Sequence, residues 1–80
     1  MKIEIFGPGC SRCESLGQLV EGVAAGEGGG ITVEKVRDMA RMMEMGILSV
    51  PAIAIDGKVM STGRIPAKEE IAGWIRSAKG

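Results

Sequence analysis

The sequence predicts an α/β domain whose elements follow one another in the order β-α-β-α-β-β-α. Short runs rich in β-branched residues recur along the chain, and stretches with apolar residues at helical spacing separate or follow them. A strand, a helix and a second strand in succession form a right-handed crossover with parallel strands, whereas Asp56-Gly57 marks a tight antiparallel hairpin. The sheet should therefore be mixed and four-stranded, with helices on both faces.

The first three elements form the predicted crossover. Residues 2–6 alternate apolar and charged side chains, which favours a short strand. From Cys13 onward apolar residues recur at helical spacing, and this helix should run from Ser11 to about Gly26. A glycine-rich loop follows, and β-branched residues then predict a second strand over residues 31–36.

The second helix is short and rich in methionine. It should begin at Asp38, a candidate N-cap, and end before Gly46. The spacing of its methionines favours packing in the core over a soft binding surface. The methionines predicted to form the buried face are Met39, Met42 and Met43.

Two strands and a helix complete the chain. The strands over residues 52–55 and 58–62 flank the Asp56-Gly57 hairpin signal. Pro66 should open the last helix, whose first turn carries two carboxylates suited to the positive helix pole. Its apolar face comprises Ile71, Trp74, Ile75 and Ala78.

Length and composition narrow the class of protein. Eighty residues make one domain, 1–80, without room for a second core. Ten basic residues balance ten acidic ones, so the charge gives no reason to expect nucleic acid or an anionic membrane as partner. No run approaches the roughly 20 apolar residues of a membrane span, and no apolar leader precedes the first strand. We therefore expect a soluble, cytoplasmic protein that is a monomer.

Both cysteines lie where the first strand turns into the first helix. Cys10 and Cys13 are three positions apart, which places their Cα atoms about 5 Å apart on a first helical turn, within reach of a disulfide. The positive pole of the helix favours a thiolate at Cys10, and Arg12 adds a positive charge beside it. Cys13 lies one turn inside, on the apolar face of the helix. We therefore predict an exposed, reactive Cys10 and a shielded Cys13.

Histidine is absent, which excludes a Cys-His hydrolase and removes the commonest metal ligand. Close C-x-x-C pairs in reducing compartments are more often catalytic or metal-binding than structural. A zinc or iron–sulfur site would need four ligands, so two chains would have to share the metal. A binding domain with an inert cysteine pair is a third alternative. We expect no metal and no cofactor besides a redox-active Cys10–Cys13 disulfide.

The opening K-I-E-I-F-G-P-G-C-x-x-C and the later V-P-A-I-A-I-D-G-K-V segment resemble a known family. With Gly63 and the final helix, they are similar to the small archaeal and bacterial thioredoxin-like redox-active disulfide proteins. The resemblance covers nearly the whole chain. It implies a thioredoxin-like fold in which the second, first, third and fourth strands lie side by side in that order.

The same resemblance assigns roles to four further residues. It implies that Pro51 is a cis-proline packed against the disulfide, and that the backbone of Val50 pairs with an extended substrate. Thioredoxins also keep a buried acid six residues before the first cysteine, paired with a lysine on the neighbouring strand. By resemblance, Glu4 would relay the Cys13 proton, directly or through one water molecule, helped by Lys35; alternatively, both are solvated strand charges.

An apolar substrate groove is a further prediction. Large apolar residues in a loop, as at Ile47 and Leu48, need a reason to be exposed. The alternative is that both cap the core beneath the second helix. The residues predicted to line the groove are Pro8, Ile47, Leu48, Val50 and Pro51.

These observations together predict a thiol–disulfide oxidoreductase. Cys10 would attack a substrate disulfide and Cys13 would resolve the mixed disulfide. The expected partners are proteins with disulfides and a thiol reductase. After Ser61-Thr62 only Gly63 stands where glutaredoxins carry Gly-Gly and a downstream Asp, which argues against glutathione use.

Overall fold

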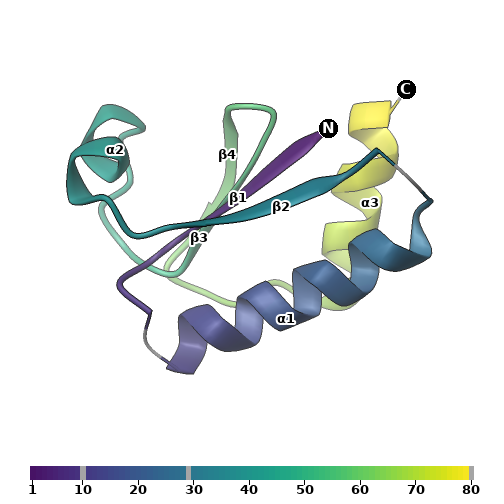
Figure 1. Ribbon diagram of the computed structural model, residues 1–80, viewed down its shortest axis with the longest axis horizontal. Helices are drawn as coiled ribbons and strands as arrows, with labels where there is room; N and C mark the ends of the chain where they lie inside the picture. Colours follow the sequence, from purple (N-terminus) through teal and green to yellow (C-terminus); the bar gives the residue numbers. More distant parts are fainter. Residues whose placement is uncertain (10, 29, 80) are drawn as a thin grey trace.

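The computed structural model describes residues 1–9, 11–28 and 30–79, and its elements follow the predicted order (Figure 1). No helix in these ranges is long and apolar enough to cross a membrane. The elements are β1 (Lys2–Phe6), α1 (Ser11–Gly26), β2 (Thr32–Val36), α2 (Met39–Glu44), β3 (Ala52–Ile55), β4 (Lys58–Thr62) and α3 (Lys68–Lys79).

The four strands form one mixed sheet in the order β2-β1-β3-β4, which confirms the predicted α/β fold. β1 pairs in parallel with β2 and antiparallel with β3, and β3 pairs antiparallel with β4. Asp56 and Gly57 join β3 to β4 with positive φ angles of 49° and 84°, as a tight two-residue hairpin requires. The first strand is therefore central, and the loop after it opens at one end of the sheet.

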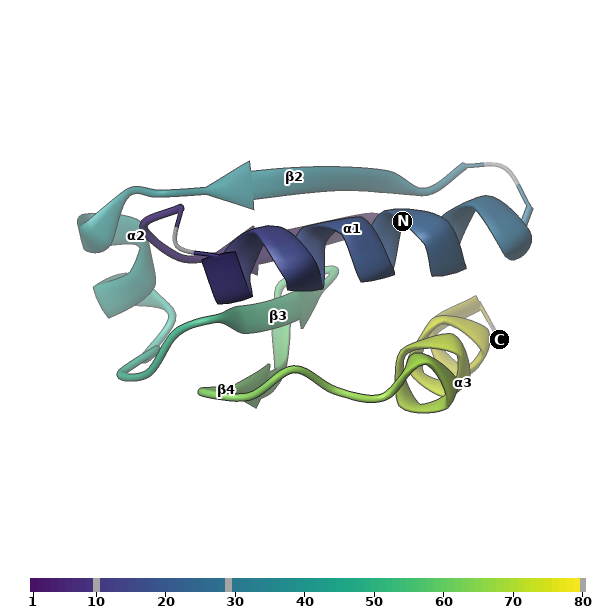
Figure 2. The same cartoon turned by 90° about the horizontal axis from the view of Figure 1, so that it is seen from below.

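Helices cover both faces of the sheet. α1 and α3 lie together on one face, and the short α2 lies on the other, near the end of the sheet where β1 runs into the loop before α1 (Figures 1 and 2). The larger core cluster lies between the sheet, α1 and α3. It consists of Ile3, Ile5, Leu16, Val20, Val23, Ile53, Ile55, Ile71 and Ile75. The smaller cluster lies under α2 and consists of Phe6, Met42, Ile47, Ala52 and Ala54.

The prediction for the methionines of α2 was correct for one of three. Met42 is buried, but the side chains of Met39 and Met43 are 66% and 77% exposed. α2 has only six residues, so it can turn only one narrow side toward the sheet. Met39 and Met43, four positions apart, share the outer side of this helix. Asp38 caps the helix as predicted, because its carboxylate accepts a hydrogen bond from the Ala40 N–H at 2.9 Å.

Candidate active site

Cys13 lies against the end of β1. Its side chain is buried, as its place on the apolar face of α1 predicts. A Cβ on Gly7 would overlap the Cys13 Sγ, so the sulfur lies directly on the glycine backbone. The Gly7 N–H donates to the Val36 carbonyl at 3.0 Å and thereby keeps this backbone aligned with β2. Cys10 is outside the described residues, and the predictions for its exposure and its disulfide fall there.

The Val50-Pro51 segment lies beside the same glycine. The peptide bond between these residues is cis, and Pro51 is buried. The Val50 Cβ is 3.9 Å from the position that a Cβ on Gly7 would take. The Pro51 carbonyl accepts a hydrogen bond of 2.9 Å from the Gly63 N–H. The turn after β4 therefore supports the segment that leads into β3.

Arg12 links the first turn of α1 to this turn. Its Nη2 donates to the Gly63 carbonyl at 3.2 Å, and the side chain is exposed. Because Gly63 also bonds to Pro51, the start of α1 and the proline segment share one anchoring point. The guanidinium of Arg12 is therefore engaged at Gly63.

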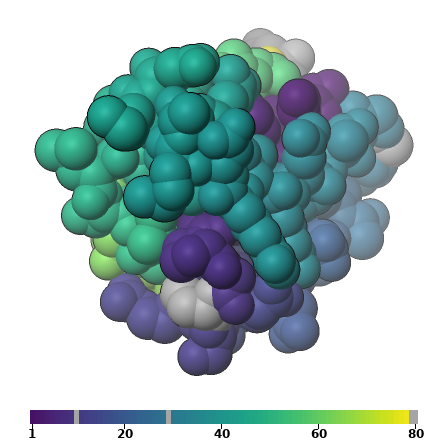
Figure 3. All heavy atoms as spheres, turned by 60° about the vertical axis from the view of Figure 1, so that its left-hand side comes forward, coloured from purple at the N-terminus to yellow at the C-terminus, as the bar shows by residue number. Residues whose placement is uncertain are grey.

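The residues predicted to line a groove separate into exposed and buried ones. Pro8 is exposed, Val50 is half-buried, and the Leu48 side chain is 96% exposed. Ile47 is buried at 6% exposure in the cluster under α2, so it caps the core and does not line a surface. Figure 3 shows the face to which this region belongs: the purple loop after β1 is at its centre, with the teal residues of α2 above.

Glu4 and Lys35 do not form the expected pair. The register places Glu4 opposite Glu34 and Lys35 opposite Ile5, so Glu4 and Lys35 point to opposite faces of the sheet. Glu4 is 3% exposed and accepts hydrogen bonds from the Arg41 Nη2 at 3.1 and 3.3 Å. Lys35 instead places its Nζ 3.0 Å from the Glu14 Oε2. The predicted pairing was therefore wrong, and so was the alternative for Glu4, whose carboxylate is buried.

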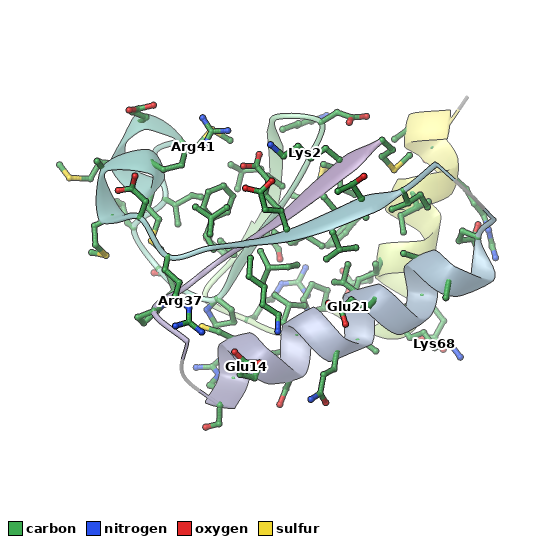
Figure 4. All side chains as sticks on the ribbon, viewed as in Figure 1. Lys2, Glu14, Glu21, Arg37, Arg41 and Lys68 are labelled. Carbon is green, nitrogen blue, oxygen red and sulfur yellow. The ribbon has the colours of Figure 1, made fainter. Side chains whose placement is uncertain are left out.

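A small cavity lies behind Cys13 on the α1 face of the sheet. Its volume is ≈ 10 Å³, and Gly7, Cys13, Glu14, Lys35 and Arg37 are among the residues that line it. Figure 4 shows Arg37 extending from the end of β2 toward Glu14, while Arg41 lies on the α2 side of the sheet.

Arg37 contacts both the carboxylate of this cavity and the loop before α1. Its Nη2 is 3.8 Å from the Glu14 Oε1. A Cβ on Gly9 would lie 3.1 Å from the Arg37 Cζ, so the guanidinium rests on this glycine, which has a φ of 90°. Glu14, Arg37 and Arg41 were not predicted from the sequence. The two-residue spacing of Lys35, in β2, and Arg37, directly after it, was the signal that both cations lie on one side.

The family model of the thioredoxin domain matches residues 1–76. The chain belongs to the thioredoxin-domain family. This thioredoxin-domain protein is 35% identical over 71 residues to a thioredoxin of Methanothermobacter thermautotrophicus, an alignment that covers 89% of this chain and 92% of the relative. It is 36% identical over 80 residues to a thioredoxin of Methanocaldococcus jannaschii, with 95% and 93% of the two chains covered.

The predicted resemblance is thereby confirmed at the level of the family. The fold, the family and the archaeal thioredoxins together identify a thioredoxin-like redox protein. Within the described residues, its site combines a buried thiol, a proline segment beside it and a charged cluster behind it.

Proposed function

We propose that this protein is a thiol–disulfide oxidoreductase that uses Cys10 and Cys13 to reduce or exchange disulfides of protein substrates. The observation that carries the proposal is the burial of Cys13, three positions after Cys10, with its sulfur against Gly7 and close to Val50. A shielded second thiol beside a proline segment suits the resolving step of disulfide exchange. Membership of the thioredoxin-domain family supports the same chemistry.

Cys10 is the nucleophile in this proposal. It directly precedes Ser11, where α1 begins, and helix N-termini favour the thiolate form of a cysteine. The Arg37 guanidinium rests on Gly9, the residue before Cys10, and adds positive charge to this part of the chain. Arg12, whose guanidinium is engaged at Gly63, has a supporting role in holding the first turn of α1 in place.

The exchange proceeds in two steps. The Cys10 thiolate attacks one sulfur of the substrate disulfide, the substrate S–S bond breaks, and the first substrate thiol leaves. The Cys13 thiolate then attacks the Cys10 sulfur and releases the second substrate thiol. The substrate gains two electrons and the Cys10–Cys13 pair loses two. An external dithiol protein, acting as reductase, returns them by the reverse exchange.

The substrate would bind across an apolar surface made of two exposed residues and one half-buried residue. Pro8, Leu48 and Val50 supply this surface, and the backbone of Val50 would pair with an extended peptide. Pro51, the residue after Val50, is buried. The preferred substrates are therefore disulfides flanked by apolar residues in an extended segment. The buried Ile47 contributes to this surface only by supporting it from below.

A trapping experiment tests the two roles. Cys13→Ser should accumulate mixed disulfides with a peptide or protein disulfide, because the resolving thiol is missing. Cys10→Ser should accumulate none, because the attacking thiol is missing. Non-reducing gels and intact-mass spectrometry would measure both variants, and the Cys10→Ser/Cys13→Ser double variant is the matched control. Metal analysis of the same samples tests the shared-metal alternative.

The proposal fails if Cys10→Ser traps as much substrate as Cys13→Ser, or if neither traps any. It also fails if Cys13 alkylates faster than Cys10 near neutral pH. A stoichiometry of one metal ion per two chains, lost in both variants, would replace it with a metal-binding function.

A further inference from the structure

We propose that Glu14 is the base that accepts the Cys13 proton during resolution, through one water molecule held in the cavity behind the sulfur. This inference rests on the proposed dithiol exchange and adds a residue to it. It moves the proton acceptor from β1, where the sequence suggested Glu4, to the first turn of α1 on the other face of the sheet.

The cavity supplies the route. Cys13 and Glu14 both line it, and its volume of ≈ 10 Å³ is about that needed for one water molecule. Polar groups of Glu14, Lys35 and Arg37 provide the partners that a water molecule requires there. A buried thiol needs such a route, because burial disfavours the charged thiolate and Cys13 itself is only 5% exposed.

Two cations hold the Glu14 carboxylate at this cavity. Lys35 Nζ lies 3.0 Å from one carboxylate oxygen, and Arg37 Nη2 lies 3.8 Å from the other. The stem of Lys35 crosses α1 at Gly17, where a Cβ would be only 2.9 Å from the Lys35 Cε. Gly17 therefore lets the lysine lie flat over the helix and reach Glu14.

Glu4 has no comparable route. Its carboxylate is bound by Arg41 of α2, on the face of the sheet opposite to α1. Ile5, between Glu4 and the cysteine loop, faces the α1 side and lines the cavity. The charged groups that line the cavity are Glu14 from α1, Lys35 from β2 and Arg37, the residue that follows β2.

The Cys13 thiol gives its proton to the water molecule, and the water molecule gives a proton to the Glu14 carboxylate. The resulting Cys13 thiolate attacks the Cys10 sulfur, the bond from Cys10 to the substrate breaks, and the substrate leaves as a thiolate. Glu14 then releases its proton to solvent, where the substrate thiolate is protonated. Lys35 and Arg37 stay charged and act as positioning residues.

Removing the Glu14 charge distinguishes proton transfer to the carboxylate from a purely electrostatic effect of the carboxylate on the thiol. A carboxylate that only lies near the thiol opposes its ionisation, so Glu14→Gln would then speed up resolution. A carboxylate that accepts the proton assists ionisation in the transition state, so Glu14→Gln would slow resolution. The two roles therefore predict opposite changes of one rate.

The measurement uses the full chain and an aromatic disulfide whose thiol product is coloured. The first equivalent of thiol reports attack by the more reactive cysteine, and the second reports resolution by the other. Glu14→Gln should slow the second release about 100-fold at neutral pH, the lower end of the range of general-base effects. In this variant, the rate of the second release should then rise about tenfold per pH unit as the pH approaches the pKa of the Cys13 thiol. The rate of the second release in the parent should rise less steeply.

Glu34→Gln is the matched control, because Glu34 lies on the same strand as Lys35 but pairs with Lys2 at 3.2 Å, away from the cavity. It should release both equivalents at the parent rates, and Glu14→Asp should recover part of the lost rate. A second release in Glu14→Gln that is as fast as in the parent, or faster, overturns the proposal. A parent protein that releases only one equivalent overturns the dithiol exchange itself, and the role of Glu14 with it.

Discussion

At the scale of single residues, Gly7 is the position where the site tolerates a side chain least. A Cβ there would overlap the Cys13 sulfur, so glycine is needed for space. Gly9, two residues on, is needed for conformation, because its φ of 90° lies in the region that side chains avoid. Gly7 and Gly9, on either side of Pro8, are therefore required for different physical reasons, although both belong to one Gly-Pro-Gly turn in the sequence.

Glu4 gives the first residue-scale prediction. Glu4→Gln should lower the free energy of unfolding by about 1–2 kcal/mol, because the variant loses charge-assisted hydrogen bonds to Arg41. The loss should stay below that of a fully buried pair, because the Arg41 side chain is 41% exposed and can be hydrated. Urea unfolding at neutral pH measures the change, with Glu34→Gln as the exposed control. The rate of mixed-disulfide resolution should not change, and a slower rate would return Glu4 to the proton route.

The sequence placed Cys13 correctly but not its acidic neighbour. Periodicity on α1 was enough to bury Cys13 beside Leu16 and Val20. The partner of Lys35, however, depends on the register between β1 and β2, and a slip of one residue turns every side chain to the other face. That register comes from packing along the whole sheet, which no local pattern reveals.

At the scale of elements, the start of α3 is stabilised by a side chain in place of a capping residue. Glu70 accepts a hydrogen bond from the Ala67 N–H at 3.2 Å and two from Arg64 at 3.1 and 3.0 Å. These bonds, the Arg64 contact first, lower the pKa of the Glu70 carboxyl below its ordinary value. Glu70 thus accepts a backbone hydrogen bond at the start of α3, as a serine or threonine at position 67 would.

The lowered pKa of Glu70 predicts a pH dependence. Because the carboxylate form is favoured in the folded state, its stabilisation is present above the ordinary pKa of 4.5 and is lost as the pH falls through the lower, folded value. Glu70→Gln should therefore lower the urea midpoint at neutral pH, and the difference from the parent should shrink in acid. Glu69→Gln, in the same helical turn, is the control. A difference that grows as the pH falls would contradict this account.

α2 was predicted only in part from the sequence. Its cap at Asp38 and its end before Gly46 followed from the sequence, but the side that it buries did not. Six residues make fewer than two turns, so spacing alone could not choose between the side with Met42 and the side with Met39 and Met43. The position of α2 over Phe6 made that choice.

At the scale of the whole molecule, the order of elements was predictable because each strand, turn and helix carries its own local signal. The division into two cores was not. The larger cluster joins α1, α3 and the sheet, whereas the smaller one holds α2 and the segment before β3. The site lies at the end of the sheet between them, with Cys13 on one face and the Arg41–Glu4 pair on the other.

Substitution of two leucines tests how large the free energy of unfolding of this small domain is. Leu16 is fully buried in the larger cluster, and Leu16→Ala should cost about 2–5 kcal/mol. A domain of this size has only about 4–12 kcal/mol in total, so the variant should be partly unfolded at moderate urea. Leu48→Ala, at a side chain that is 96% exposed, should change stability by less than about 0.5 kcal/mol. Circular dichroism during urea titration measures both.

Leu48→Ala should nevertheless slow attack on a peptide disulfide flanked by apolar residues, and leave attack on a small polar disulfide unchanged. Stopped-flow rates with the two substrates would show the difference. Equal slowing, or none, would remove Leu48 from the proposed substrate surface.

The direction of β1 determines where the termini lie relative to the loop before α1. The strand begins at Lys2 and reaches the cysteine loop only after Phe6, so Met1 lies at the end of the sheet away from that loop (Figure 1). The last turn of α3 lies at the same end (Figures 1 and 2). An affinity tag, a fluorophore or an electrode linker joined to either terminus would therefore lie at the end of the sheet opposite to the loop before α1.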